Sequence, residues 1–366
     1  MPKLEKTITL QDACTLVGQS KDVFAPIKEA ISNSFDSIIQ RQRCFSKDFK
    51  PEVNLSFYFV KNVNLALEEN TELSSVVIKD NGIGFTRENL CNFKALASKS
   101  KGMNNRGTGL IQMFCRFSKL TIHSIFNEDD KWKELNLSWD KTGEYACDVL
   151  EKTSDTIHCT SVELSDFCGN PKELDFFLSY IHDISHLKSD ILKYFLLRLW
   201  LGSQETGLSL TIQVYKDGTC LNSYVFDSSN IPIPDKTEYI KIATEQAKIK
   251  RCKSGKSAIE IVWEKVDPEY TLTINRFKIP SRDANENAIY LCSNGITICQ
   301  IKFPTIKRKD TVFDGYRFIT SIQGTLLDDP SFITHTVDGF TFPDKKRLRL
   351  KYQNLMICSI KKINTS

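Results

Sequence analysis

The sequence predicts an α/β fold in which helices cover one face of a mixed β-sheet, followed by a second domain of α+β type. Three observations support this prediction. An amphipathic helical pattern spans Val23–Arg43, alternating apolar segments typical of strands follow it, and an apolar helix at Leu187–Leu201 precedes a run of further strands. The 366 residues are enough for about two domains.

The first helix is predicted by apolar residues that recur at helical spacing on one face. These residues are Phe24, Ile27, Ile31, Phe35 and Ile38. Pro26 fits only the first turn of this helix, because a proline further along would break its backbone hydrogen bonds.

Strands are predicted where apolar residues alternate with polar ones or form short runs. In the first half these segments are Val53–Val60, Ser75–Asp80, Leu120–Phe126, Lys133–Trp139 and Thr160–Phe167. In the second half they are Leu208–Tyr215, Ser257–Trp263, Thr271–Phe277, Ala288–Gln300 and Tyr316–Gly324. The pattern changes around the apolar helix, so we expect one domain over residues 1–180 and a second over residues 181–366.

The composition indicates an ordinary globular chain, with 41% hydrophobic and 26% charged residues. No apolar run approaches the roughly 18 residues of a membrane span, and the first residues lack the apolar core of a signal peptide, so we expect a cytoplasmic protein without membrane contact. The twelve cysteines are scattered without a CxxC pair, which favours reduced thiols over disulfides or zinc. A net charge of +4 permits nucleic-acid binding without arguing for it.

The polar face of the first helix carries Glu29, Asn33 and Asp36 at spacing i, i+4 and i+7. A solvated helix face is the simplest interpretation. However, Asn and Asp are unfavourable within a helix, and the neighbouring residues are small, which leaves room for a ligand. A carboxylate one turn from an amide oxygen suits a general base beside a Mg²⁺ ligand.

Two glycine-containing segments follow. The predicted strand Ser75–Asp80 ends in a carboxylate, and glycines come two and four residues later. The polar stretch Ala97–Phe114 passes through two more glycines into an apolar helical run, where backbone N–H groups can converge on an anion. Neither this stretch nor Lys253–Ala258 fits a Walker A loop.

Taken together and in this order, the segments EAISNSFDS, DNGIGF, RGTGL and HCTSVEL resemble the four nucleotide-binding motifs of the GHKL ATPase superfamily, which includes gyrase, histidine kinases and MutL. The resemblance covers about residues 20–170 and implies the Bergerat fold, an α/β sandwich that binds ATP and Mg²⁺.

The resemblance also implies a role for each matching residue. Asp80 would accept a hydrogen bond from the adenine amino group, and Gly82 and Gly84 would let the backbone pass close to the base. Asn33 would be the Mg²⁺ ligand, and Glu29 the base that activates the attacking water.

In the same comparison, Ala97–Phe114 corresponds to the lid over the triphosphate. Its implied phosphate contacts are Lys99, Lys101, Arg106, Gly107, Thr108, Gly109 and Leu110. Thr160 would support adenine binding beside Asp80, through a water molecule, and Asp36 would orient the helix or Asn33. Two features depart from the family pattern: Cys159 stands where a glycine is usual, and Asn104–Arg106 occupies the approach to the lid glycines.

The second half is similar to the transducer domain of gyrase, MutL, chaperone and MORC ATPases, a βαβ module resembling a ribosomal-protein fold. In such domains a cation reaches the γ-phosphate, and the candidates here are Lys278, Arg282 and Lys302. For each one taken separately, a solvated loop charge is the simpler interpretation. The segment before Glu29 contains no histidine, and a glutamate base suits hydrolysis, so a histidine kinase is disfavoured.

We therefore expect a slow, Mg²⁺-dependent ATPase that closes and forms a homodimer around bound ATP. Three classes stay open from the sequence: a clamp acting on DNA, an ATPase acting on a protein partner, and a nucleotide sensor without hydrolysis. The basic stretches Ile306–Asp310 and Lys345–Lys351 weakly favour DNA. A companion effector protein is expected because neither domain resembles an output domain.

Overall fold

The structure is a computed structural model that describes twelve ranges of residues. They are 14–15, 18–45, 49–63, 69–94, 109–154, 156–251, 259–303, 306–310, 315–329, 333, 339–340 and 348–352. The chain divides into two compact units, Met1–Ile231 and Pro232–Ser366, which are described separately.

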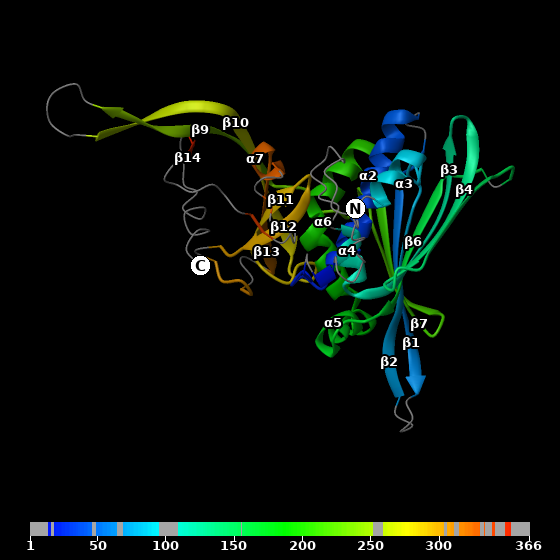
Figure 1. Cartoon of the computed structure of the whole chain (residues 1–366). Helices are drawn as coiled ribbons and strands as arrows, with labels where there is room; N and C mark the ends of the chain where they lie inside the picture. The colour runs from blue at the N-terminus through cyan, green and yellow to red at the C-terminus, as the bar shows by residue number, and fades with distance from the viewer. Residues whose placement is uncertain are drawn as a thin grey trace. The chain divides into compact units, whose positions relative to one another are not determined.

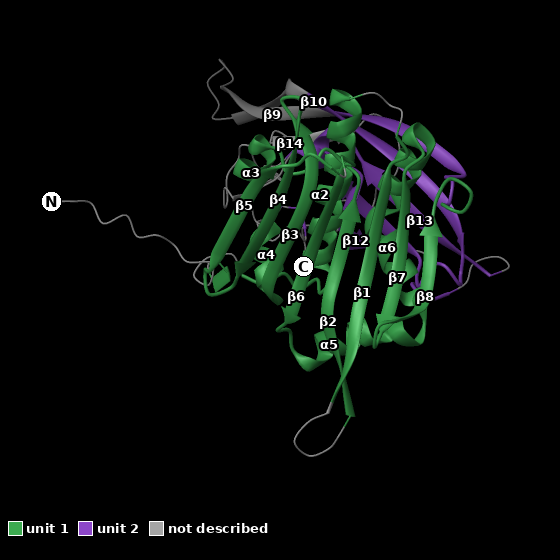
Figure 2. Ribbon diagram, turned by 90° about the vertical axis from the view of Figure 1, so that its right-hand side faces the viewer, with its two compact units in different colours: residues 1–231 green, residues 232–366 purple. Residues whose placement is uncertain are grey.

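Unit 1 contains an eight-stranded sheet in the order β5-β4-β3-β6-β2-β1-β7-β8, seen face-on in Figure 2. Its strands are β1 (Glu52–Val63), β2 (Glu69–Asp80), β3 (Phe117–Glu128), β4 (Lys131–Asp140), β5 (Tyr145–Glu151), β6 (Cys159–Phe167), β7 (Ser209–Lys216) and β8 (Thr219–Phe226). The β1–β7 pair is parallel and the others are antiparallel, so the predicted mixed sheet is confirmed.

Helices cover one face of this sheet, as the sequence predicted; α2, α4 and α6 lie on the same side (Figures 1 and 2). The helices of unit 1 are α2 (Ala25–Cys44), α3 (Arg87–Lys94), α4 (Gly109–Phe114), α5 (Pro171–His182) and α6 (Ile184–Thr206). Pro26 lies in the first turn of α2, where its missing N–H costs no hydrogen bond. The architecture is an α/β sandwich.

The core of unit 1 follows from the alternation of the strands. On β1, Val53, Leu55, Phe57 and Phe59 are all buried at 1% exposure or less, because successive strand residues point to opposite faces of the sheet. The buried side of α2 packs its apolar residues onto the same layer. This burial holds α2 against the carboxyl end of β2.

The division between the units lies at Ile231/Pro232, whereas the sequence suggested residues 180/181. The physical reason is strand pairing: β7 pairs in parallel with β1 over Glu52–Phe59, and β8 then pairs with β7. The apolar helix α6 and the two strands after it therefore complete the first sheet. Hydrophobic periodicity predicts such strands but not which sheet they join.

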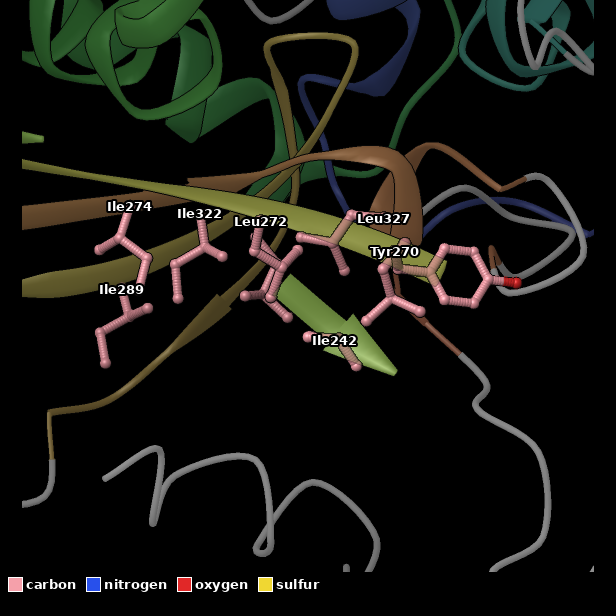
Figure 3. Close-up of a cluster of buried hydrophobic side chains, with 9 residues drawn as sticks. Ile242, Tyr270, Leu272, Ile274, Ile289, Ile322 and Leu327 are labelled. Carbon is pink, nitrogen blue, oxygen red and sulfur yellow. The ribbon is translucent and has the colours of Figure 1, made fainter. Parts of the chain in front are cut away.

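Unit 2 contains a six-stranded sheet in the order β12-β11-β13-β10-β9-β14. Its elements are β9 (Lys236–Arg251), β10 (Ile259–Pro280), β11 (Ala288–Ser293), β12 (Ile296–Ile301), β13 (Tyr316–Gln323), α7 (Thr325–Asp328) and β14 (Leu348–Tyr352). A compact apolar cluster holds the sheet and α7 together, and Figure 3 shows Leu272, Ile322 and Leu327 within it. Gly324, the N-cap residue of α7, has φ 144°, and a Cβ there would overlap the backbone of Thr271.

The topology of unit 2 differs from the predicted βαβ module. Its parallel pair is β11–β13, and the described part of the connection between these strands contains strand β12 and no helix. In the described residues of unit 2 the helical element is the single turn α7. Across the described chain, none of the helices is both long enough and apolar enough to cross a membrane.

Candidate functional site

Asp80 is the last residue of β2, and its carboxylate is buried at 5% exposure. One oxygen, Oδ2, accepts a hydrogen bond from Ser34 Oγ of α2 at 2.8 Å, and Oδ1 accepts one from the backbone N–H of Gly82 at 2.9 Å. Burial raises the pKa of Asp80 to about 6, although hydrogen bonds from Gly82, Ser34 and Ser37 oppose this rise. A buried carboxylate held by few donors can accept a further hydrogen bond from a ligand.

Thr160 lies beside Asp80 on the neighbouring strand. The two residues are register partners in the β2–β6 pair, and Thr160 also pairs with Ser124 of β3. The hydroxyl groups of Thr160 and Ser124 form a hydrogen bond of 2.9 Å. Cys159 directly precedes Thr160 on the strand, so its side chain belongs to the opposite face of the sheet and does not change the face that Thr160 occupies.

The turn after Asp80 passes close to α2 and β3, which explains its two glycines. A Cβ at Gly82 would overlap Ser37 of α2. Gly84 has φ 85°, and a Cβ there would lie 2.6 Å from Cβ of Phe126. The glycines therefore bring this backbone into a crowded position against the helix and the sheet.

Serine residues of α2 and β3 hold the turn in place. The backbone N–H of Ile83 donates to the Ser37 carbonyl at 3.1 Å, and that of Phe85 donates to Ser124 Oγ at 3.2 Å. Ser34, Ser37 and Ser124 were not predicted as site residues. The signal for the first two was the run of small residues on the predicted helix, whereas nothing in the sequence distinguishes Ser124.

Glu29 and Asn33 lie one turn apart on α2, and both are half-buried. No described residue hydrogen-bonds the side chain of Asn33, so its amide oxygen is open to a ligand. Asp36, one turn further along, forms an ion pair with the buried Arg198 of α6. Asp36 thus ties α2 to α6.

Gly109, the first residue of α4, lies directly against Glu29. A Cβ built on Gly109 would overlap the Glu29 carboxyl group, and Leu110 after it is buried. The structure thereby brings the first motif and the end of the third motif together. The other predicted residues of the loop lie outside the described residues: Lys99, Lys101, Arg106, Gly107 and Thr108.

The side-chain oxygens of α2 can be compared with the ligands that a magnesium ion requires. In the described part of the chain no group of three or more His, Cys, Asp or Glu side chains could enclose a metal. Mg²⁺ is commonly held by one or two protein oxygens together with substrate phosphates and water, rather than by a full protein cage. The oxygens of Asn33 and Glu29 fit this second mode of binding.

The three candidate sensing cations lie in unit 2, and all are exposed. Lys278 Nζ lies 4.2 Å from the ring centroid of Tyr316, and Arg282 lies 3.6 Å from Asp283. Lys302 follows β12. Their positions give no reason to prefer one of the three as the sensing cation.

The comparisons with known proteins give little beyond this geometry. No protein-family model and no curated protein matches the sequence. Among solved structures, the crystal structure of the N-terminal domain of a DNA repair protein is similar, with 12% identity, a TM-score of 0.45 and 87% of each chain covered. This similarity is too low to assign a function, so the residues of the site carry the proposal.

Proposed function

We propose that this chain is a Mg²⁺-dependent ATPase of the GHKL (Bergerat) type. The observation that carries the proposal is the double contact of α2: Ser34 donates a hydrogen bond to the buried Asp80, and Glu29 lies against Gly109. One rigid helix thus connects the carboxylate that would receive adenine with the glycine that would face the phosphates. Asn33 lies between these contacts.

Adenine recognition would depend on the buried end of β2. The free acceptor capacity of Asp80 suits the amino group of adenine, and the hydroxyl of Thr160 lies on the adjacent strand. The glycines let the turn pack against Ser37 and Phe126, which fixes the backbone next to Asp80. A buried acceptor that loses its partner is costly, so this arrangement favours adenine over a base without an amino group.

Hydrolysis would depend on Glu29. Its carboxylate would take a proton from the attacking water while the phosphate chain lies along α2, and positioning supplies most of the catalysis in phosphoryl transfer. Mg²⁺, when bound through Asn33, would neutralise charge on the phosphates. We infer that binding of ATP also drives closure and formation of a homodimer, and that a companion protein receives the signal.

DNA is the partner that we favour for this ATPase. Strand β14, which includes Arg349 and Lys351, pairs antiparallel with β9, which includes Lys241, Lys248, Lys250 and Arg251. The acidic residues of these two strands are Glu238 and Glu245. In the register of this pair Arg349 lies opposite Glu245 and Lys351 opposite Ala243. The support for DNA is therefore the basic composition of these strands, because a phosphate backbone attracts positive charge.

The ATPase proposal is tested with labelled ATP. We expect Asp80→Asn to weaken ATP binding by about 1.5–3 kcal/mol, or roughly ten- to a hundredfold. Glu29→Ala should bind ATP normally but hydrolyse it about 10²- to 10⁴-fold more slowly. The control is Glu88→Ala, which removes an exposed glutamate on α3. The proposal fails if both site variants behave like this control.

The DNA proposal is tested separately, by fluorescence anisotropy with a labelled duplex at several salt concentrations. We expect log affinity to fall linearly with log salt, and Arg349→Ala with Lys351→Ala to reduce that slope by about two units. Binding that is insensitive to salt, or recovery of one stoichiometric protein and no DNA, would instead favour a protein partner. ATP binding without hydrolysis would indicate a nucleotide sensor.

A further inference from the structure

Two cysteines meet at a single backbone carbonyl in unit 1. The thiol of Cys14 donates to the Ile111 carbonyl oxygen at 3.7 Å, and the backbone N–H of Cys115 donates to the same oxygen at 3.0 Å. Each thiol also shifts the pKa of the other through a hydrogen bond between them. Two cysteines from segments far apart in the sequence thus meet at one carbonyl group.

These cysteines join two segments that already contact each other through polar groups. The segment after Cys14 is held by α4: Gln112 accepts from the Ser20 backbone N–H at 2.9 Å and donates to the Gly18 carbonyl at 3.0 Å. Cys115 follows the last residue of α4. The contact between the thiols therefore lies at one end of a larger junction between the N-terminal segment and α4.

The surroundings of the two thiols shift their pKa values in opposite directions. The hydrogen bond from Cys115, together with the positive charge of Lys141, lowers the pKa of Cys14 to about 7 against the opposing effect of burial. The same hydrogen bond raises the pKa of Cys115, and burial adds to this rise. Cys14 is thus the thiolate that can attack a disulfide near neutral pH, and Cys115 is the thiol beside it. Both side chains are partly exposed, so a small oxidant can reach them.

We propose that Cys14 and Cys115 form a reversible disulfide by exchange with a low-molecular-weight disulfide such as oxidised glutathione. The Cys14 thiolate attacks one glutathione sulfur and releases the first glutathione thiolate, which leaves a mixed disulfide on Cys14. The sulfur of Cys115 then attacks the Cys14 sulfur and releases the second glutathione. The two cysteine protons pass to the two released glutathione thiolates, so two cysteines are oxidised and one glutathione disulfide is reduced.

The disulfide would fix the position of α4. This helix begins at Gly109, which lies against Glu29, so the cross-link would restrain the element that borders the candidate base. We infer that the oxidised form hydrolyses ATP more slowly, and this second statement alone rests on the proposed ATPase function. Such a bond is reversible in a reducing cytosol, as redox-sensing disulfides are.

The disulfide is tested on the full chain, reduced and then equilibrated with glutathione buffers of stepped redox potential. Free thiols are alkylated, and the peptides are identified by mass spectrometry. We expect one linkage, between Cys14 and Cys115, and a loss of two hydrogen atoms from the intact mass. Cys91→Ser should form the same linkage, because Cys91 is an exposed residue of α3 outside this junction. Cys115→Ser should stop at the glutathione adduct on Cys14.

Absence of the Cys14–Cys115 linkage at every potential, or pairing of Cys14 with another cysteine, would overturn the proposal. Circular dichroism checks that Cys115→Ser is folded. We expect it to fold because serine keeps a hydrogen-bond donor at this position. ATP hydrolysis is measured on the same samples. If the linkage forms and neither form hydrolyses ATP, the ATPase proposal fails and the disulfide stands. If the reduced form hydrolyses ATP and the oxidised form is equally fast, the inference of regulation is wrong.

Discussion

Gly109 of α4 packs against Glu29 of α2 so closely that any side chain at position 109 would overlap the glutamate carboxyl group. The first residue of one helix thus limits where the candidate base on another helix can lie. A loop that ends in glycine allows this approach, whereas a loop that ends in any other residue would push the carboxylate aside. The relationship makes position 109 a sensitive probe of the site.

Gly109→Ala is expected to displace Glu29 or α4. Overpacking of this kind costs about 1–3 kcal/mol of the free energy of unfolding, and ATP hydrolysis should fall with it. Urea unfolding and a hydrolysis assay measure the two effects. The double variant Gly109→Ala with Glu29→Ala removes the overlap, so it should regain stability while hydrolysis stays lost. Wild-type values for the single variant would contradict the close contact.

Adenosine binding should strengthen as the pH rises through about 6. Burial raises the pKa of Asp80 to about 6, and the ionised carboxylate is the stronger acceptor for the adenine amino group. Adenosine is the ligand of choice because it lacks phosphates that titrate in the same range. Isothermal titration calorimetry between pH 5 and 8, with Asp80→Asn as the control, checks this expectation. A flat pH profile for the wild type would rule out Asp80 as the titrating group.

The stability of the ligand-free protein should depend on pH in the opposite sense. The pKa of Asp80 is raised from 3.8 to about 6 in the folded state, so between these values the folded chain binds more protons than the unfolded chain. The free energy of unfolding of the wild type should therefore decrease, relative to Asp80→Asn, as pH rises from about 4 to about 6, and then level off. Urea unfolding of both proteins at stepped pH provides the comparison.

Asn33 is expected to determine the response to magnesium. Asn33→Ala removes the amide oxygen proposed as the ligand, so the Mg²⁺ concentration for half-maximal hydrolysis should rise about tenfold or more. Asn33→Asp keeps an oxygen at this position and should retain part of the response. Chelation of Mg²⁺ should stop hydrolysis in all three proteins. An unchanged Mg²⁺ requirement in Asn33→Ala would place the ion elsewhere.

The ion pair of Arg116 is expected to contribute more to stability than the exposed ion pair of Lys131. Its side chain is 1% exposed, and it donates to Glu173 at 2.9 Å and to the Ser20 carbonyl at 2.8 Å. Arg116→Met leaves the partner carboxylate buried and should cost about 3–5 kcal/mol. Lys131→Met is the matched control, because its pair with Glu151 is exposed at 61% and 66% and should contribute about 1 kcal/mol or less. Denaturant unfolding of both variants distinguishes the two cases.

Periodicity explains which parts of the fold were predictable. The helix around Pro26, the alternating strand β1 and the strands β3 and β4 were recognisable because each depends on residues that are close in sequence. The assignment of β7 and β8 to the first sheet was not, because strand pairing across the chain leaves no local signal. The same limit applies to the βαβ module predicted for the second unit.

The sequence by itself determined the chemical groups of the candidate site and their order along the chain: the carboxylate of Glu29, the amide of Asn33, the strand that ends in Asp80, and the glycines after it. Only the tertiary structure decided that Ser34 would hold Asp80, that Gly109 would touch Glu29, and that Arg198 would engage Asp36. The physical reason is the distance along the sequence over which each kind of interaction acts. Residue type and local spacing set helices, strands and turns, whereas contacts between distant segments depend on how whole elements pack.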